Sequence, residues 1–550
     1  MSDAAKEKRQ GSHKALLAEN QTHKRRERAQ ELSSKRREGI LAKRRRLVDQ
    51  SAQQPEGEGQ SWSQEEVQAV VAKVLSSSAG TVLGPLSELR QVLSLEDPPI
   101  QEVVEAGLAP KLVELLAEPS DEIKIEATWC ISNIASGDSH QTQHVVGSAP
   151  NLIAFLSANN PVLQEHALFA LGNMAGDCAS YREMLHANGT LLPASRLLQA
   201  PPTPAVARTA AWAVCNLARG SATPAKPFLD AGVLPPLMAA LAAGASGGNV
   251  DAGLVVEAAW TLAFLLAKED MPMDTVLGAG GASTLVQLLA RSGGEDPLCT
   301  PVLRALGNVV SSTRDECVGA VMDQPQFLPA LNAILTSLPA HPPAPNTVQK
   351  SEHRALIKEA AWVASNVAAA RAVDRKQVAG SGVLGSLLGL LGCGQFDLQK
   401  EAAFAVWNLV STPDGAARLT EILKTPGVVD AYVGMLRVPD ADAVRCAMSF
   451  VRLVCDKVPG GAHLVERHRG LEAIDDLHYG PVHPELSAAA ATIVDQFFGD
   501  DYEGQGDEEW FQPPPPPQGG GAAAVPTHSM GRGKHLTSPS WMHGAAQQQS

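Results

Sequence analysis

The feature that most constrains this chain is a two-residue pattern that recurs through its middle. In each copy an aromatic residue is followed four positions later by an asparagine. The copies are Trp129 with Asn133, Phe169 with Asn173, Trp212 with Asn216, Trp362 with Asn366, and Phe404 with Asn408. On a helix, a step of four places both side chains on one face, about one turn apart. The pattern therefore predicts a row of similar helices, each presenting an aromatic ring and an amide. We call these positions the ladder.

The spacing of the copies predicts the fold. Two further copies are imperfect: Phe264 takes the asparagine position after Trp260, and Arg304 takes the aromatic position before Asn308. With these included, the steps between asparagine positions are 40, 43, 48, 44, 58 and 42 residues. Periods of roughly 40–47 residues are typical of helical armadillo or HEAT repeats. The longest step contains the proline-rich insert at 339–346, which we expect to be an exposed loop.

Composition along the chain predicts four regions. Residues 1–50 form a basic arm, and residues 51–62 form a polar linker. Helical repeats occupy residues 63–498, closing with a helix near 483–498. Residues 499–550 begin acidic and become rich in proline and glycine, a composition that cannot bury a core.

Several classes of protein are disfavoured. No apolar run reaches the roughly 18–20 residues that a membrane span needs, and the polar N-terminus lacks the apolar segment of a signal peptide. The eight cysteines are scattered without a CxxC pair, which is typical of reduced core residues in a cytosolic or nuclear protein. No histidine has metal-ligand spacing and no catalytic constellation is evident, so we expect no enzyme activity, metal or cofactor.

Charge is divided unevenly between the arm and the rest of the chain. Residues 1–50 carry 15 Lys and Arg against 7 Asp and Glu, a net of +8, whereas the remaining residues carry a net of −22. Such an arm could bind a polyanion, fold back onto its own acidic body or dock on an acidic partner. Most of its basic residues fall into three clusters, which contain Arg25, Arg26, Arg28, Lys35, Arg36, Arg37, Lys43, Arg44, Arg45 and Arg46.

The basic arm and the ladder together resemble the importin-α family, the armadillo-repeat adaptors of nuclear import. The most similar segments are EATWCISNIASGDSHQT (126–142), EHALFALGNMAGD (165–177), LRALGNVVSS (303–312) and KEAAFAVWNL (400–409). The resemblance covers residues 13–505. It implies an all-α fold, a right-handed superhelical solenoid of about ten armadillo repeats. It also implies that the arm binds importin-β.

The resemblance further implies two binding sites for cargo peptides. In the major site, Asp177 is implied to pair with the key lysine of the cargo. The residues of the major site are Trp129, Asn133, Gly137, Thr142, Phe169, Asn173, Asp177, Trp212, Asn216, Glu257 and Trp260. Those of the minor site are Arg304, Asn308, Glu359, Trp362, Asn366, Glu401, Phe404 and Asn408.

The chemistry of the ladder suits a basic peptide in an extended conformation. Asparagine side chains offer both a donor and an acceptor to the peptide backbone. Tryptophan faces could sandwich the stems of Lys or Arg, with a cation–π contribution of about 0.5–2 kcal/mol each. A single aromatic residue at helical spacing is usually core. Five aromatic–asparagine pairs in register favour a binding surface, because asparagine is rarely buried without partners.

The chain departs from the family pattern at several positions. Phe169 and Phe404 stand where tryptophan is expected, and phenylalanine offers the weaker cation–π face. We therefore expect a weaker grip there, above all in the minor site. The acidic residue expected after the Trp260 segment is absent, since Leu266 and Ala267 occupy that stretch.

We expect a nonenzymatic adaptor that shuttles between cytoplasm and nucleus, binds cargo in the ladder and binds importin-β through the arm. The family implies release by Ran-GTP, recycling by a nuclear exportin and indirect contact with pore proteins. It also implies competition of Lys43–Arg46 with cargo for one groove. We expect neither membrane insertion nor specific nucleic-acid binding. The alternative is a cytosolic armadillo scaffold whose arm binds RNA or acidic partners. Deleting residues 1–50 should raise affinity for a basic peptide only under the adaptor hypothesis.

Overall fold

The computed structural model describes residues 62–95, 97–220, 223–293, 296–312, 314–337, 348–412, 415, 417–479 and 484–499. Every regular element among them is a helix, which confirms the predicted all-α class. The predictions for the basic arm, most of the linker, the insert at 339–346 and the C-terminal tail lie outside these residues.

The described helices form an opening pair followed by nine groups of three. The pair is α2 (Gln64–Ser76) and α3 (Leu83–Leu93). The first helices of the groups are α4 (Ile100–Glu105), α7 (Ser139–Thr142), α10 (Ala179–Ala187), α13 (Lys226–Asp230), α16 (Met273–Gly278), α19 (Asp315–Met322), α22 (Ala372–Gly380), α26 (Leu419–Leu423) and α29 (Gly461–Arg467). A short 3₁₀ helix, η1 (Val146–Ser148), follows α7.

The second helices of the groups are α5 (Ala109–Leu115), α8 (Ala149–Phe155), α11 (Leu191–Gln199), α14 (Leu234–Ala245), α17 (Gly281–Arg291), α20 (Phe327–Leu335), α23 (Gly382–Leu391), α27 (Val428–Met435) and α30 (Gly470–Tyr479). The third helices are the longest: α6 (Asp121–Ile134), α9 (Pro161–Asp177), α12 (Pro204–Ala218), α15 (Ala252–Leu266), α18 (Cys299–Val310), α21 (Val348–Ala368), α24 (Phe396–Val410), α28 (Ala441–Lys457) and α31 (Pro484–Phe497). This succession is an armadillo solenoid.

Most third helices begin at a residue whose side chain caps them. Ser120, Asn160, Thr203, Asp251 and Asp440 each accept a hydrogen bond from a backbone N–H in the first turn of their helix. A cap of this kind satisfies an N–H group that has no partner inside the helix. The start of each capped helix, and hence the position of its ladder residues along the helix, is therefore set by local sequence.

Glycine separates the first helix of a group from the second. Gly107 and Gly232 have φ angles of 76° and 72°, in the left-handed region that other residues rarely adopt. They lie in the segments EAGLAP and DAGVLPP. One helix ends and the next begins at each of these segments.

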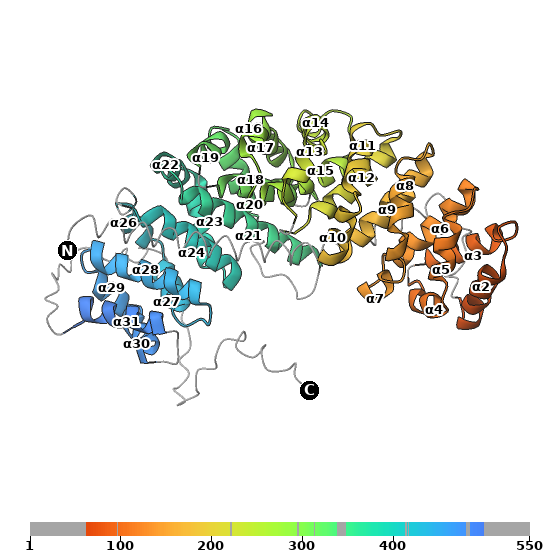
Figure 1. Cartoon of the computed structure of the whole chain (residues 1–550). Coiled ribbons are helices and arrows are strands. Elements are labelled where there is room, and N and C mark those ends of the chain that lie inside the picture. The colour runs from red at the N-terminus through yellow and green to blue at the C-terminus, as the bar shows by residue number, and fades with distance from the viewer. Residues whose placement is uncertain are drawn as a thin grey trace, which may run out of the picture. The chain divides into compact units, whose positions relative to one another are not determined.

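The third helices pack against one another in chain order, from α3 through α6, α9, α12, α15, α18 and α21 to α24, and then α28 (Figure 1). The second helices from α11 to α27 also pack in series. A continuous apolar core lies between these rows. All eight cysteines are free thiols, and six of them are buried, as predicted for core residues. No helix in the described residues is long and apolar enough to span a bilayer.

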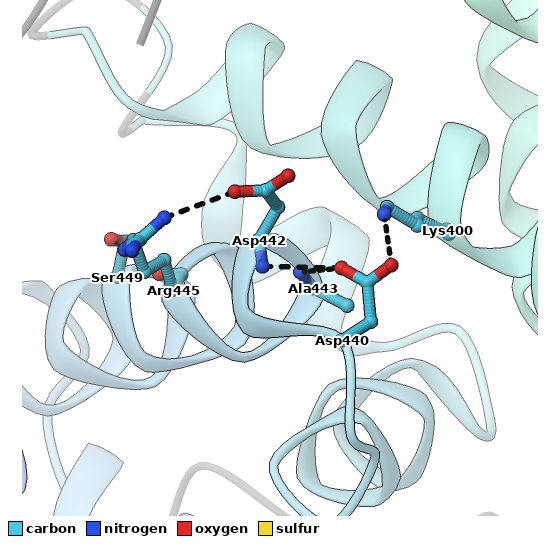
Figure 2. Close-up of polar contacts among 6 residues, drawn as sticks. All are labelled: Lys400, Asp440, Asp442, Ala443, Arg445 and Ser449. Atoms are coloured by element: carbon cyan, nitrogen blue, oxygen red, sulfur yellow. Dashed lines mark hydrogen bonds and ion pairs between the residues drawn. The ribbon is translucent and has the colours of Figure 1, made fainter. Parts of the chain in front are cut away.

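Ion pairs connect the beginnings of successive third helices. Figure 2 shows the connection between α24 and α28, where Lys400 donates to Asp440. The other carboxylate oxygen of Asp440 caps α28 by accepting from the backbone N–H groups of Asp442 (3.1 Å) and Ala443 (3.0 Å). One carboxylate thus starts α28 and ties it to α24, whose ladder positions are held in register with the next repeat.

Candidate functional site

The structure places every predicted ladder residue on a third helix. Because these helices pack side by side, residues about 40 positions apart in sequence become neighbours. The pairs lie on α6 (Trp129, Asn133), α9 (Phe169, Asn173), α12 (Trp212, Asn216), α15 (Trp260, Phe264), α18 (Arg304, Asn308), α21 (Trp362, Asn366) and α24 (Phe404, Asn408).

The asparagines tie each third helix to the one before it. In four of them Nδ2 donates to the backbone carbonyl just before the ladder position on the preceding helix: Asn173 to Ser132 (2.9 Å), Asn216 to Gly172 (3.0 Å), Asn308 to Ala263 (2.8 Å) and Asn408 to Ser365 (2.9 Å). Asn133 donates instead to Ser94 Oγ at 3.1 Å. At least one amide N–H of each of these asparagines is therefore used by the solenoid itself, and the Oδ1 of Asn216 also accepts from Arg219 at 2.9 Å.

Two asparagines have a polar atom without a partner among the described residues. The Oδ1 of Asn173 accepts no hydrogen bond, and the Nδ2 of Asn366 donates none. Both side chains are buried. Because burying an unpaired polar group is costly, each atom is a candidate contact for a ligand.

The aromatic rings of the major site touch one another. Trp212 is buried and lies against Gly172, and its ring centroid is 5.8 Å from that of Phe169. This distance is direct aromatic contact, which leaves no room for a Lys or Arg stem between the two rings. A Lys or Arg stem that contacts this pair would therefore not lie between the two rings. A stem can lie only across their outer edges.

Asp177 lies at the end of α9, beside the first helix of the same group. Ser139 Oγ donates to Asp177 Oδ1. The hydroxyl of Tyr181 reaches the carbonyl of Ser139 at 3.4 Å, and burial together with Cys178 and Asp177 raises its pKa. Asp177 as a whole is half-buried, and its Oδ2 atom is buried.

The loop with Gly137 and Thr142 supports this corner. A β-carbon at position 137 would lie 2.0 Å from Gln141 Oε1, so a larger residue there would require the Gln141 side chain to move. The side chain of Thr142 is fully buried, and its hydroxyl donates to the carbonyl of Asp138 at 2.9 Å. Thr142 therefore holds the loop from beneath and does not present its hydroxyl at the surface.

Glu257 and Trp260 on α15 are both buried, and each residue has 5% of its surface exposed. The rings of Trp260 and Phe264 are 5.7 Å apart on the same helix. Both ladder positions on this helix are therefore aromatic, as the sequence showed.

In the minor site, Arg304 and Glu359 neutralise each other. The guanidinium of Arg304 donates two hydrogen bonds to the carboxylate of Glu359, and only 11% and 8% of the two side chains are exposed. The guanidinium also lies 5.9 Å from the ring centroid of Trp362. Two predicted cargo contacts thus form a buried internal pair. At the far end of the site Glu401 is buried, Phe404 is half-buried, and Lys400 lies 6.0 Å from the Phe404 ring.

Comparison with known proteins agrees with this architecture. The family described as armadillo/β-catenin-like repeat matches residues 96–136. Importin subunit alpha-9 of Arabidopsis thaliana is 30% identical over 480 residues, which cover 84% of this chain and 88% of that protein. This chain belongs to the importin-α family. Its general role is therefore that of an adaptor in nuclear import.

Other similarities point the same way. Importin subunit alpha-2 of Oryza sativa subsp. japonica is 30% identical over 433 residues, which cover 76% of this chain and 78% of that protein. The crystal structure of an engineered protein superimposes on this importin-α chain with a TM-score of 0.65 and 25% sequence identity. The match covers 79% of this chain and 99% of the engineered protein.

Sequence reasoning missed two residues of this importin-α ladder. Arg219 donates to Asn216 Oδ1 at 2.9 Å, so it sets the orientation of that amide. Arg90 on α3 lies 4.5 Å from the ring centroid of Trp129 and pairs with Glu126 at 2.8 Å. A signal for Arg90 was available, since it precedes Ser94 by four positions, as Arg304 precedes Asn308.

Proposed function

We propose that the ladder binds extended Lys/Arg-rich peptides of the nuclear-localisation type, and that the basic arm links this complex to importin-β. The general import role follows from the family.

The observation that carries the proposal is the series of ladder asparagines. Their hydrogen bonds to the preceding helix hold successive amides in one orientation, and Asn173 keeps an acceptor that has no donor among the described residues. A row of fixed amides recognises the repeating N–H and C=O groups of an extended backbone, whatever its side chains are. Backbone recognition of this kind suits a family of different cargo signals.

Asp177 supplies the preference for cations. It lies at the end of the same helix as Asn173, one turn beyond it. A peptide clamped at Asn173 would therefore bring a neighbouring lysine or arginine to the Asp177 carboxylate. A charge-assisted hydrogen bond there is worth roughly twice a neutral one.

The minor site is the weaker of the two under this proposal. Arg304 and Glu359 are already paired, and Phe404 offers a poorer cation–π face than tryptophan. We expect short basic signals to occupy the major site first. Long signals with two basic clusters gain a smaller contribution from the minor site.

The arm accounts for loading and release. Its net charge of +8 against −22 for the rest of the chain favours its return to its own body when it is not bound to importin-β. Lys43–Arg46 would then compete with cargo for the ladder, so that importin-β binding and cargo binding are linked. Release by Ran-GTP and recycling by an exportin complete the proposed cycle, in which the protein moves between cytoplasm and nucleus.

The test is the binding of a monopartite basic peptide to the full chain and to the chain without residues 1–50. We expect micromolar or tighter binding by the truncated chain, weaker binding by the full chain, and restoration by importin-β. The variant Asp177→Lys with Trp212→Ala should lose binding at least about tenfold. The control Asp230→Lys changes an exposed carboxylate that pairs only with Lys226 and should leave binding unchanged. Absence of peptide binding by the truncated chain, with RNA binding that depends on residues 1–50, would favour the scaffold alternative.

A further inference from the structure

Side chains from both neighbouring helices, Arg90 on α3 and His166 on α9, lie against the Trp129 ring. The guanidinium carbon of Arg90 lies 4.5 Å from the ring centroid, which is the geometry of a cation–π contact. The imidazole of His166 stacks on the ring with centroids 4.6 Å apart and planes inclined by 27°. A peptide lysine that approached Trp129 would meet these two side chains.

Arg90 is also paired with an acid. Its Nε lies 2.8 Å from Glu126 Oε2, and the two side chains are 16% and 19% exposed. Glu126 lies three positions before Trp129, one turn earlier on α6. The acid and the ring together make a site for a cation, and Arg90 fills it.

The same arrangement recurs at the minor site. Arg304 pairs with Glu359, which lies three positions before Trp362, and its guanidinium lies over the Trp362 ring. In both cases the arginine comes from the preceding helix of the same row, α3 for Arg90 and α18 for Arg304, and lies four positions before the residue in the asparagine position. Two independent copies of one arrangement indicate that the acid and ring select a guanidinium.

We propose that Arg90 is an internal ligand that closes the first cation position of the ladder and so sets where a cargo peptide can begin. This inference rests on the proposed function. Without the Arg90 side chain, Glu126 and Trp129 form one more subsite for a Lys or Arg of the peptide. His166 packs on the ring from α9 and keeps it in place.

The experiment uses peptides with runs of four and six lysines between identical Gly-Ser flanks, bound to the full chain. The measured quantity is the ratio of the two dissociation constants, because competition by the arm affects both peptides alike and cancels. In Arg90→Ala the affinity for the six-lysine peptide should rise more than that for the four-lysine peptide. We expect the ratio of the two dissociation constants to change by about 3- to 30-fold from its wild-type value. In the double variant Arg90→Ala with Glu126→Ala the ratio should return to the wild-type value.

Two further variants make the result decisive. Arg90→Met keeps the volume of the aliphatic part of the arginine side chain but removes the charge. If Arg90→Ala does not fold, Arg90→Met takes its place in the comparison. Arg208→Ala is the matched control, since Arg208 pairs with Asp251 at 3.0 Å on neighbouring third helices and should leave the ratio unchanged. An unchanged ratio in the Arg90 variants, or a gain that persists without Glu126, would overturn the inference. Failure of the wild type to bind either peptide would instead overturn the proposed function.

Discussion

Trp212 on α12 lies directly against Gly172 on α9: a β-carbon at position 172 would lie 2.3 Å from Cζ3 of the ring. The side chain of Asn216, one turn later on α12, donates to the carbonyl of the same glycine at 3.0 Å. One glycine therefore receives both the aromatic ring and the amide of the next repeat. The spacing of the ladder across these two helices depends on its lack of a side chain.

Replacing Gly172 by alanine should push the Trp212 ring away from α9. We expect the variant to lose about 1–3 kcal/mol of stability through overpacking, despite the roughly 1 kcal/mol that alanine gains over glycine in a helix. Gly176→Ala on the same helix is the control, because its β-carbon would lie 3.5 Å from Asn216 Nδ2, an ordinary contact. Hydrogen exchange in α9 and α12 measures the effect, and equal protection in the two variants would contradict it.

The asparagines differ in what they contribute to stability. Asn408→Ala removes a hydrogen bond to the Ser365 carbonyl and should cost about 1 kcal/mol. Asn366→Ala removes an amide nitrogen that donates no hydrogen bond to the described residues, and should cost less. Urea unfolding, monitored by hydrogen exchange in α21 and α24, compares the stability of the two variants. A larger loss for Asn366→Ala would mean that its amide has a structural partner.

The buried pair between Arg304 and Glu359 should be costly to break from one side only. Arg304→Met leaves a carboxylate with 8% of its side chain exposed and no opposite charge, a change that typically costs about 3–5 kcal/mol. Arg304→Met with Glu359→Met should recover most of that loss, because no charge remains buried. Thermal unfolding of Arg304→Met, Glu359→Met and the double variant gives the coupling free energy between the two side chains. Additive losses would show that the two side chains act separately.

His166 should make the protein sensitive to mild acid. Burial, and secondarily Arg90, lowers its pKa from 6.5 to about 4. The unfolded chain therefore takes up a proton between about pH 6.5 and 4 that the folded chain refuses, so stability falls over that window, by at most on the order of 3 kcal/mol. Above pH 6.5 this contribution is complete.

The measurement is the urea midpoint at pH 7.5 and at pH 5 for the wild type, His166→Gln and His463→Gln. His166→Gln should reduce the difference between the two pH values. His463, whose side chain is 85% exposed, serves as the matched control and should leave the difference as in the wild type. Equal pH dependence in all three proteins would exclude His166 as its source.

Much of the fold was predictable because it depends on local chemistry. The period of the aromatic–asparagine pattern placed Trp129, Phe169 and Trp212 on equivalent helices, and residues such as Ser120 and Asn160 start those helices by capping them. The breaks at Gly107 and Gly232 follow from backbone conformations that glycine tolerates. These signals act within a few residues, so a single sequence carries them.

The partners of the ladder side chains were not predictable in the same way. The resemblance implied cargo contacts at Trp129, Arg304 and Glu359, whereas the Trp129 ring is covered by Arg90 and His166 and the two charges pair with each other. Each of these contacts joins residues 37 to 55 positions apart. Such contacts depend on how far apart neighbouring helices lie, which spacing along one helix cannot specify.

By itself, the sequence determined the repeat, the helices and the face on which the ladder lies, because period and capping are properties of adjacent residues. Only the tertiary structure decided which ladder groups remain for a ligand. Asn173 Oδ1 has no partner among the described residues and the Asp177 carboxylate accepts from Ser139, while Arg90 and Arg304 already occupy their acid and ring. The reason is physical: a side chain is available or occupied according to what the neighbouring helix places within a few ångströms of it.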